Sequence, residues 1–328
     1  MSSSMQFYVS NLLIYLGVDV MACLGLNLQF GVAGLIDFSF IVFQAAGAYT
    51  AAVLTLGPSS AHGGFQSYIL GAHLPFPIPF LAAAVVGGVL SLLVGLIALR
   101  RLRSDYQAMV MLVISLIATT VVTNATGLFN GSNGLALIPQ PLKSTLHLSN
   151  VAYQWAYVVI TLICTVLVWI VVRRITSSPL GRTLRAMRDN DAAAAALGKN
   201  VTQLRLIAFV TGGAIAGLSG AVLAQFLTAW SPGSWLFPES FVFFSAIIVG
   251  GSGNNVGAVV GAALVPVAFL EATRFIPQFG YPGLVDALQW VVVGLLTLGV
   301  MWFRPRGVFP ERIQRFARPP ANRAGSKS

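Results

Sequence analysis

The chain has 328 residues, of which 56% are hydrophobic and only 9% are charged, with a mean hydropathy of +0.82. A soluble domain carries about 25% charged residues to cover its surface, so this composition excludes soluble enzymes and disordered proteins and predicts an integral membrane protein. The net charge of +10 would suggest nucleic-acid binding in a soluble protein. However, 17 of the 19 Lys and Arg residues lie in three short segments beside apolar runs. This distribution is typical of the cytoplasmic loops of membrane proteins and excludes nucleic acid as a partner.

The apolar runs predict an all-α fold, a bundle of about eight membrane-spanning helices that forms one transmembrane domain over residues 1–328. A helix needs about 20 apolar residues to cross the hydrocarbon core, and the backbone there must pair with itself, which favours helices over open strands. The N-terminal run lacks the basic segment of a signal peptide and is expected to remain as a span. In chain order, the predicted spans are 7–28, 31–56, 80–99, 107–128, 153–172, 206–229, a broken pair over 239–270, and 284–303.

The three basic segments predict the orientation of these spans. If 100–103, 173–205 and the basic tail 304–328 are cytoplasmic, then 129–152, 230–238 and 271–283 are external. The first 99 residues carry no Lys or Arg and give no orientation of their own. The stretch 239–270 must then enter the membrane and return. Its two short apolar halves are separated by GGSGNN, which predicts discontinuous or re-entrant helices.

The main cytoplasmic loop, 173–205, contains signals for two short helices in tandem. Ser178 can cap a helix that begins at Pro179, and Asn190 or Asp191 can cap a second helix that ends at Gly198. The first helix is amphipathic: Leu180, Leu184 and Met187 share one face, and Arg182, Arg185 and Arg188 share another. A solvated loop whose arginines only set topology remains one interpretation. The capped, amphipathic helix favours a second, in which apolar anchors dock into a groove on a partner.

Five blocks in order resemble the permease subunits of ATP-binding-cassette importers, and specifically the LivM-type permeases for branched-chain amino acids. They are LGLNLQFGVAGLIDFSF followed by AAGAYTAAVL, then RLRSDYQAMV, GSNGL, SPLGRTLRAMRDNDAAAAALG and FRPRG. Two positions depart from the family pattern. Ala192 stands where the general importer motif prefers Glu, and residues 37–44 lack the Gly-His pair common in the first block, which leaves the exact substrate open.

The resemblance implies that residues 179–198 are the coupling loop that contacts an ATPase subunit, with Ala193, Ala194 and Gly198 matching the small-residue core of its motif. The residues expected to couple to the ATPase are Leu180, Gly181, Arg182, Leu184, Arg185, Met187, Arg188, Asp189, Ala193, Ala194 and Gly198.

The resemblance also implies the partners: a second related permease, two cytoplasmic ATPase subunits and an external solute-binding protein, assembled in a bacterial inner membrane. The chain has no G-x-x-x-x-G-K-[ST] motif, so ATP and Mg²⁺ are expected on the ATPases, and this chain is expected to bind no cofactor and to be no enzyme. Leucine, isoleucine and valine are the favoured solutes, with urea or a short amide as the alternative. A secondary transporter with Asp37 or Asp19 as its ion site remains a second, less favoured hypothesis.

Polar residues in or beside the spans are candidates for the translocation path, because an ionised side chain at mid-membrane costs about 2.5–3.5 kcal/mol on insertion scales. Asp37 could instead cap a broken helix, and Asn and Gly in the external loop could simply form a tight turn. Glu239 is expected to stabilise a helix start. The path candidates are Asn27, Asp37, Ser39, Gln44, Asn130, Ser132 and Asn133.

Two pairs of glycines predict close helix packing, within the chain or against the second permease. They are Gly213 with Gly217 and Gly257 with Gly261, each four residues apart. Cys23 and Cys164 lie in apolar stretches and are expected in the core. The three histidines, His62, His73 and His147, have no metal-ligand spacing, so no metal site is expected.

Overall fold

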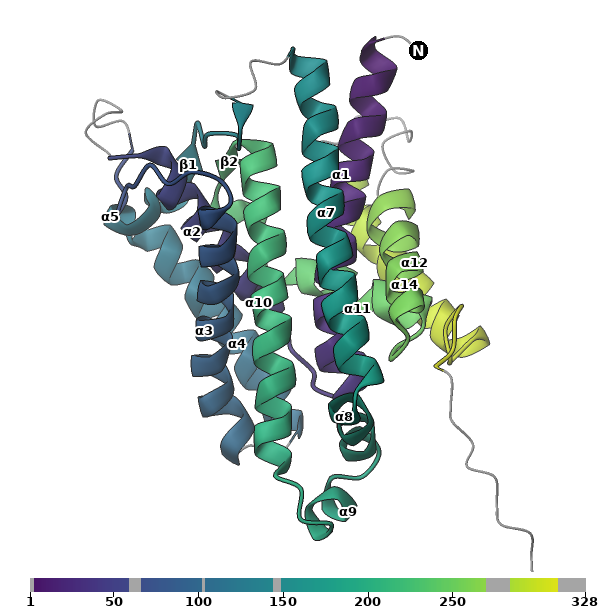
Figure 1. Cartoon of the computed structure of the whole chain (residues 1–328). Helices are drawn as coiled ribbons and strands as arrows, with labels where there is room; N and C mark the ends of the chain where they lie inside the picture. Colours follow the sequence, from purple (N-terminus) through teal and green to yellow (C-terminus); the bar gives the residue numbers. More distant parts are fainter. Residues whose placement is uncertain (1–2, 59–65, 102–103, 144–148, 270–283, 312–328) are drawn as a thin grey trace, which may run out of the picture.

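The computed structural model describes residues 3–58, 66–101, 104–143, 149–269 and 284–311. Within these ranges it is a helical bundle with one small antiparallel sheet (Figure 1), which confirms the predicted all-α membrane fold. Six of its helical segments are long and apolar enough to cross a membrane, and three shorter apolar helices cover Phe40–Leu56, Asn255–Val267 and Trp290–Phe303. About eight spans are therefore plausible.

The described elements, in chain order, are α1 (Ser3–Leu26), η1 (Asn27–Val32), α2 (Phe40–Leu56), α3 (Ile78–Arg101), α4 (Ser104–Asn124), α5 (Thr126–Phe129), η3 (Gly131–Asn133), β1 (Leu135–Ala136), α7 (Asn150–Ser177), α8 (Pro179–Asp189), α9 (Asp191–Ala196), α10 (Val201–Leu227), β2 (Ala229–Trp230), η4 (Pro232–Ser234), α11 (Pro238–Gly250), α12 (Asn255–Ala262), η5 (Ala263–Phe269) and α14 (Leu284–Phe303).

Small residues let α10 pack closely against α2 and α3, and α10 lies near the middle of the bundle (Figure 1). An added Cβ at Gly217 would collide with the Ala83 carbonyl of α3, and one at Gly47 of α2 would collide with the Gly217 backbone. Gly213 approaches Ser91 of α3 in the same way. Close backbone approach of this kind increases the dispersion contacts that hold helices together in lipid, where no hydrophobic effect operates between helices.

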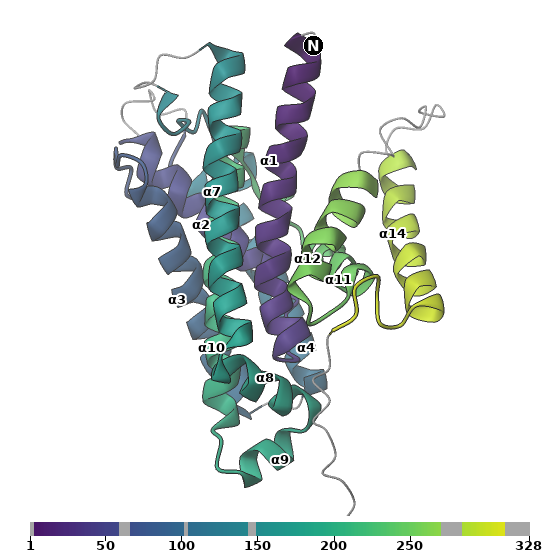
Figure 2. The same cartoon turned by 45° about the vertical axis from the view of Figure 1, so that its right-hand side comes forward.

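The two ends of the bundle carry different elements. In Figure 2, α8 lies at the end of α7 and beside the end of α10, α9 projects beyond both helices, and the N-terminus lies at the opposite end. The sheet pairs Leu135 with Trp230 and Ala136 with Ala229 at the end where the N-terminus lies (Figure 1). The described parts of the predicted external loops, 129–143 and 230–238, thus share one end and 173–205 lies at the other, which agrees with the predicted alternation of loops.

The predicted single span 31–56 is wrong, because the chain is not helical between Val32 and Phe40. Gly34 adopts a φ of +73°, which favours glycine and ends the helix. The carboxylate of Asp37 then accepts a hydrogen bond from the Ser39 N–H just before α2 begins. Asp37 therefore lies in an irregular segment, at the start of a half-helix, and not inside a continuous span.

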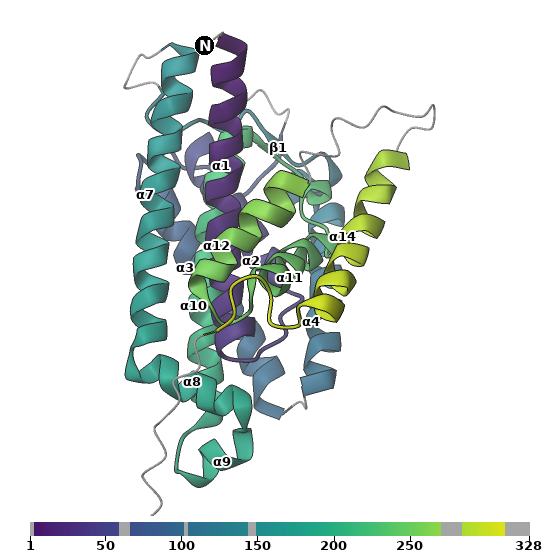
Figure 3. The same cartoon turned by 90° about the vertical axis from the view of Figure 1, so that its right-hand side faces the viewer.

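The predicted break within 239–270 is confirmed. α11 ends at Gly250 and α12 begins at Asn255, and the four residues between them, here called the α11–α12 turn (251–254), include Gly251 and Gly253 with φ of +115° and +81°. Gly257 and Gly261 bring α12 against Gly250 and Ala246 of α11. Figure 3 shows this hairpin lying between α1 and α14.

The packing around α10 predicts that Gly217→Ala destabilises the protein. Its Cβ would collide with a backbone carbonyl of α3, which cannot rotate away, and overpacking of this kind costs about 1–3 kcal/mol. Thermal unfolding of the purified protein in detergent measures the effect. Gly294→Ala on α14 is the control, because no atom of the described residues lies within 4 Å of its added Cβ. Equal stability of both variants would contradict the close approach of α10 and α3.

Candidate functional site

The loop 173–205 folds into two capped helices, as its sequence predicts. The Ser178 hydroxyl accepts the Gly181 N–H at 3.4 Å, with Pro179 as the first residue of α8. The Asn190 side chain caps α9 by accepting the Ala193 N–H at 3.0 Å. Gly198 follows α9 with a φ of +76°. Local capping signals are therefore sufficient to place both helices.

The apolar face of α8 is turned toward this chain. Leu184 and Met187 are 0% and 1% exposed, and Leu180 is half-buried. Gly181 packs so closely under α7 that an added Cβ would collide with the Thr176 carbonyl. Leu184 and Met187 are therefore covered by this chain and not exposed to a partner here, and their role in ATPase coupling stays a prediction. They hold α8 to the bundle.

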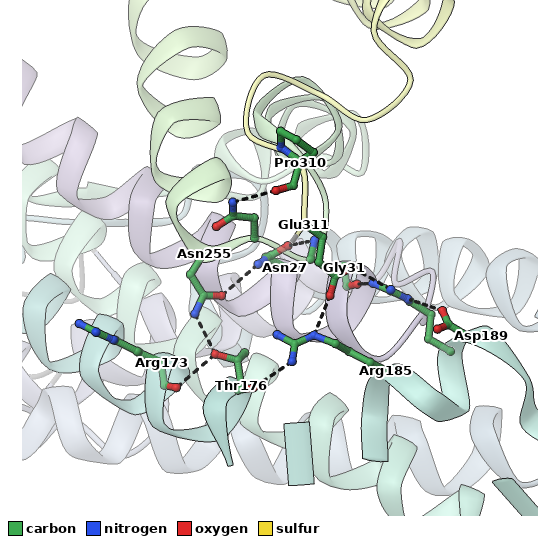
Figure 4. A network of polar contacts seen from close by, with 12 residues as sticks. Asn27, Gly31, Arg173, Thr176, Arg185, Asp189, Asn255, Pro310 and Glu311 are labelled. Atoms are coloured by element: carbon green, nitrogen blue, oxygen red, sulfur yellow. Dashed lines mark hydrogen bonds and ion pairs between the residues drawn. The ribbon is translucent and has the colours of Figure 1, made fainter. Parts of the chain in front are cut away.

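The basic face of α8 is also not simply solvated. Arg185 and Arg188 share one carboxylate, that of Glu311: Arg185 Nε lies 2.6 Å from Oε1 and an Arg188 guanidinium nitrogen 2.8 Å from Oε2 (Figure 4). Arg185 also donates to the Thr176 carbonyl at 3.1 Å, and Arg188 donates to the Gly31 carbonyl of η1. Of the three arginines, only Arg182 is exposed. Charge-assisted bonds of this kind are the stronger hydrogen bonds in proteins.

Residues 304–311, here called the C-terminal strap, are not a free basic tail. The Val308 and Phe309 N–H groups donate to the Val249 and Gly250 carbonyls, both at 2.9 Å. Asn254 of the α11–α12 turn donates to the carbonyls of Phe309 and Pro310 at 3.2 and 3.3 Å. The strap therefore covers the end of α11 and brings Glu311 to α8. The rest of the predicted tail, 312–328, lies outside the described residues.

Asn27 joins η1 to the same turn. Its amide oxygen accepts the Gly253 N–H at 2.9 Å, and its amide nitrogen donates to Asn255 at 3.3 Å. Asn255 in turn donates to the Thr176 hydroxyl of α7 at 2.9 Å. Both ends of the Asn27 amide are thus used between elements, and the side chain is 0% exposed. Asn27 therefore bridges two elements in this structure, and its place in the translocation path stays a prediction. These contacts form one set, here called the α8 network: Asn27, Gly31, Thr176, Arg185, Arg188, Gly253, Asn255 and Glu311.

The other path candidates near the break are buried in this conformation. Asp37 and Ser39 are 0% exposed and Gln44 is 2% exposed. Asp37 accepts both the Ser39 N–H and the Ser39 hydroxyl, at 2.9 and 2.6 Å. Gln44 lies on α2 where α10 approaches at Gly220. All three side chains are thus covered by the described part of the chain, and their role in translocation stays a prediction.

The external loop candidates divide into two kinds. Asn130 has a φ of +63°, donates to the Gly134 carbonyl at 2.9 Å and accepts the Ser67 N–H at 3.4 Å, so its side chain closes the loop. Ser132 and Asn133 are exposed on η3. Only the latter two are available to a solute or partner at this end of the molecule.

Two further expectations concern charged and metal-binding groups. Glu239 lies in the first turn of α11, where a carboxylate interacts favourably with the helix dipole. Among the described residues, no group of three or more His, Cys, Asp or Glu side chains could hold a metal ion. His62 and His147 lie outside those residues.

Sequence reasoning missed two residues that the structure brings forward. Leu197, just after α9, is 80% exposed, the single large apolar side chain at the tip of this loop. The sequence feature that could have identified it is its position as a lone leucine after an alanine run. Glu311 is the one acidic residue in the basic segment 304–328, and that isolation was its signal.

The chain matches known permeases over most of its length. The model of the family described as branched-chain amino acid transport system / permease component matches residues 8–301. The chain is 30% identical to the high-affinity branched-chain amino acid transport system permease protein LivM of Escherichia coli K12, over 88% of this chain and 66% of that protein. It therefore spans about two thirds of that relative's length.

Two further relatives are similar over most of both chains. The probable branched-chain amino acid transport permease protein LivM of Methanocaldococcus jannaschii is 24% identical, over 93% of this chain and 94% of that protein. The high-affinity permease protein LivH of E. coli K12 is 23% identical, over 85% of this chain and 89% of that protein. No solved structure gave a significant match.

The α8 network predicts that Asn27→Ala loosens the α11–α12 turn. The substitution leaves the buried Gly253 N–H without its acceptor, and an unpaired buried donor costs about 1–3 kcal/mol. Hydrogen exchange followed by mass spectrometry should show faster exchange over 251–255 than in the parent protein. Asn133→Ala, at an exposed position, should leave that exchange unchanged. Unchanged exchange in Asn27→Ala would contradict the bridging role of Asn27.

Proposed function

The chain belongs to the permease component family of branched-chain amino acid transport systems, and from this premise we propose that it is the membrane-spanning subunit of an ATP-driven importer of leucine, isoleucine and valine. The family makes it a transport component and a multi-pass membrane protein. We place the α8–α9 end and the C-terminus in the cytoplasm, because the basic segments gather there. The observation that carries the proposal is the pair of capped helices at this end, within the matched region.

The surface offered to an ATPase is the outer side of α8 and α9. Arg182, Asp189 and most of the residues from Asn190 to Asn200 are exposed, whereas Ala194 is buried against the chain. Leu197 projects from this surface with 80% of its area exposed. An exposed leucine amid small residues is suited to fill an apolar pocket on a partner, and it takes over the anchoring role first assigned to Leu184 and Met187. ATP and Mg²⁺ would be bound by that partner.

A second permease and an external solute-binding protein complete the proposed assembly. The relatives include both a LivM and a LivH permease, which supports pairing with a related subunit. The exposed η3 residues Ser132 and Asn133, with the neighbouring sheet, lie at the external end, where a binding protein would deliver solute. The long apolar faces of α3, α4 and α7 are available to lipid or to the second permease.

The solute is a small zwitterion with an apolar side chain. The family and the two LivM relatives favour this solute over urea or a short amide. The ion-coupled alternative depended on Asp37 or Asp19 as an ion site. One carboxylate oxygen of Asp37 accepts two hydrogen bonds from Ser39, just before α2 begins, which supports a role of Asp37 in local structure.

Loss of the Leu197 side chain should weaken the ATPase complex. Burying a leucine is worth about 1.5–3 kcal/mol, so Leu197→Ser should lower ATPase recovery by about tenfold or more when tagged permease is purified from its host in mild detergent and the subunits are quantified by mass spectrometry. Leu137→Ser is the matched control, since Leu137 is also exposed, at 70%, but lies beside β1 at the opposite end. Recovery of no ATPase with the unmodified chain would refute the importer proposal itself.

Uptake measured with the purified assembly identifies the solute. In proteoliposomes supplied with the copurified binding protein and ATP, labelled leucine should accumulate, and excess isoleucine or valine should compete with it. Urea and acetamide should not compete, because they lack the apolar side chain and the charged groups of the amino acid. Competition by urea at the same excess as valine would favour the alternative solute class.

A further inference from the structure

Glu311 is the single carboxylate shared by two arginines of α8. Its two oxygens are taken by different guanidiniums, from Arg185 and Arg188, which are one helical turn apart. The three side chains are 32%, 26% and 19% exposed in the order Arg185, Arg188 and Glu311. Without this carboxylate, the only acidic partner in the described residues would be the exposed Asp189, 3.4 Å from Arg188, and the two like charges of Arg185 and Arg188 on one side of a short helix would repel.

The strap that carries Glu311 is fixed at its other end to the α11–α12 turn. Two backbone hydrogen bonds join Val308 and Phe309 to the end of α11, and two more run from Asn254 to the strap. The approach is so close that an added Cβ at Gly251 would collide with the Phe309 carbonyl. A displacement of Glu311 must therefore be passed to the turn, because few intervening bonds can absorb it.

The same displacement reaches the break between η1 and α2. Arg188 bonds Gly31 directly, and Asn27 bonds Gly253 from the other side. Arg188 thus bonds α8 to η1, which ends directly before the irregular segment 33–39, and Asn27 bonds η1 to the α11–α12 turn. Irregular backbone at membrane depth is found where a transport protein lines its cavity or binds solute.

We propose that Glu311 is a positioning residue for transport, which holds α8 to the α11–α12 turn so that a movement of α8 shifts the turn and η1 together. The inference rests on the proposed function, because it assumes that an ATPase moves α8. It adds that Glu311 and the strap residues bonded to α11 and the turn, 308–310, are a working part of the coupling machinery. Its role is to convert a displacement of the outer loop into a change at both broken segments.

The test is the ratio of solute transported to ATP hydrolysed in the reconstituted assembly. Glu311→Gln keeps the size of the side chain and removes its charge. We expect the ATPases to remain bound and ATP hydrolysis to continue, while the ratio falls by about tenfold, within the range of measured coupling energies between sites. Arg306→Gln is the matched control, because Arg306 lies on the same strap and is exposed. Its ratio should not change.

A second set of variants separates positioning from mere folding. If Glu311 acts through Arg185, then Glu311→Gln combined with Arg185→Gln should lower the ratio no further than the single variants, since coupled residues are not additive. A further variant combines Glu311→Cys and Arg185→Cys in a background with Cys23→Ala and Cys164→Ala. With both new thiols reduced, its ratio of solute transported to ATP hydrolysed should be low. A short bifunctional thiol reagent joining the two should restore the ratio.

The outcomes are distinct from those that test the importer proposal. If the unmodified chain retains its ATPases but Glu311→Gln has an unchanged ratio, or loses hydrolysis and transport in equal proportion, the positioning role is refuted and the importer proposal stands. Loss of the ATPases from Glu311→Gln alone, or failure of the cross-link to restore the ratio, also refutes it. Absence of ATPases from the unmodified assembly refutes the importer proposal first.

Discussion

The structure depends on one constraint: a backbone that leaves the helical conformation inside a membrane protein must find partners for its free N–H and C=O groups. Two of the described segments that interrupt predicted spans are 33–39 and 251–254, and η1, directly before the first, lies against the second. Asn27 supplies an acceptor for Gly253, Arg188 supplies a donor for Gly31, and the C-terminal strap supplies donors for Val249 and Gly250. The first break is satisfied locally, because the N–H groups of residues 33–35 bond carbonyls of η1. The second is held by Asn27 and by the strap, so the positions of α8, the strap and η1 are determined together.

Glycine makes this meeting possible. An added Cβ on Gly31 would collide with the Gly253 N–H and with the Asn27 amide oxygen, and one on Gly251 would collide with the strap. The same device holds α10 against α2 and α3, but there the glycines sit in regular helices whose backbone groups are already paired. Close packing between the regular helices of the bundle therefore stabilises their arrangement. Close packing at the breaks, in contrast, depends on hydrogen bonds from a few side chains.

Much of this arrangement could be predicted from the sequence, because hydropathy and capping are local signals. The spans, the break at GGSGNN and the caps at Ser178 and Asn190 follow from neighbouring residues alone. The break at 33–39 was missed because the apolar run continues through it, and only Gly34 and Asp37 mark it. Helical periodicity gave the two faces of α8 but not their surroundings. The partner of Arg188 lies 123 residues away along the chain, and no local pattern reports a contact at that distance.

The ion pair at Glu311 is not explained by stability alone. Partly buried salt bridges contribute little net stability, and an apolar contact of the same size would hold α8 as well or better. The carboxylate instead fixes the orientation of α8 relative to the strap. It accepts a hydrogen bond from Arg188 and forms an ion pair with Arg185, so two residues of α8 fix its register on the strap, and the polar bonds of Asn27 and Asn255 extend that register to η1 and α7. The opposite side of the loop, with Arg182 and Leu197, is free of these bonds in the described part of the chain. The inner face of α8 is thus bonded to the elements beside the two breaks, and its outer face is available to a partner. A helix that transmits a movement from a partner to the breaks needs both of these faces.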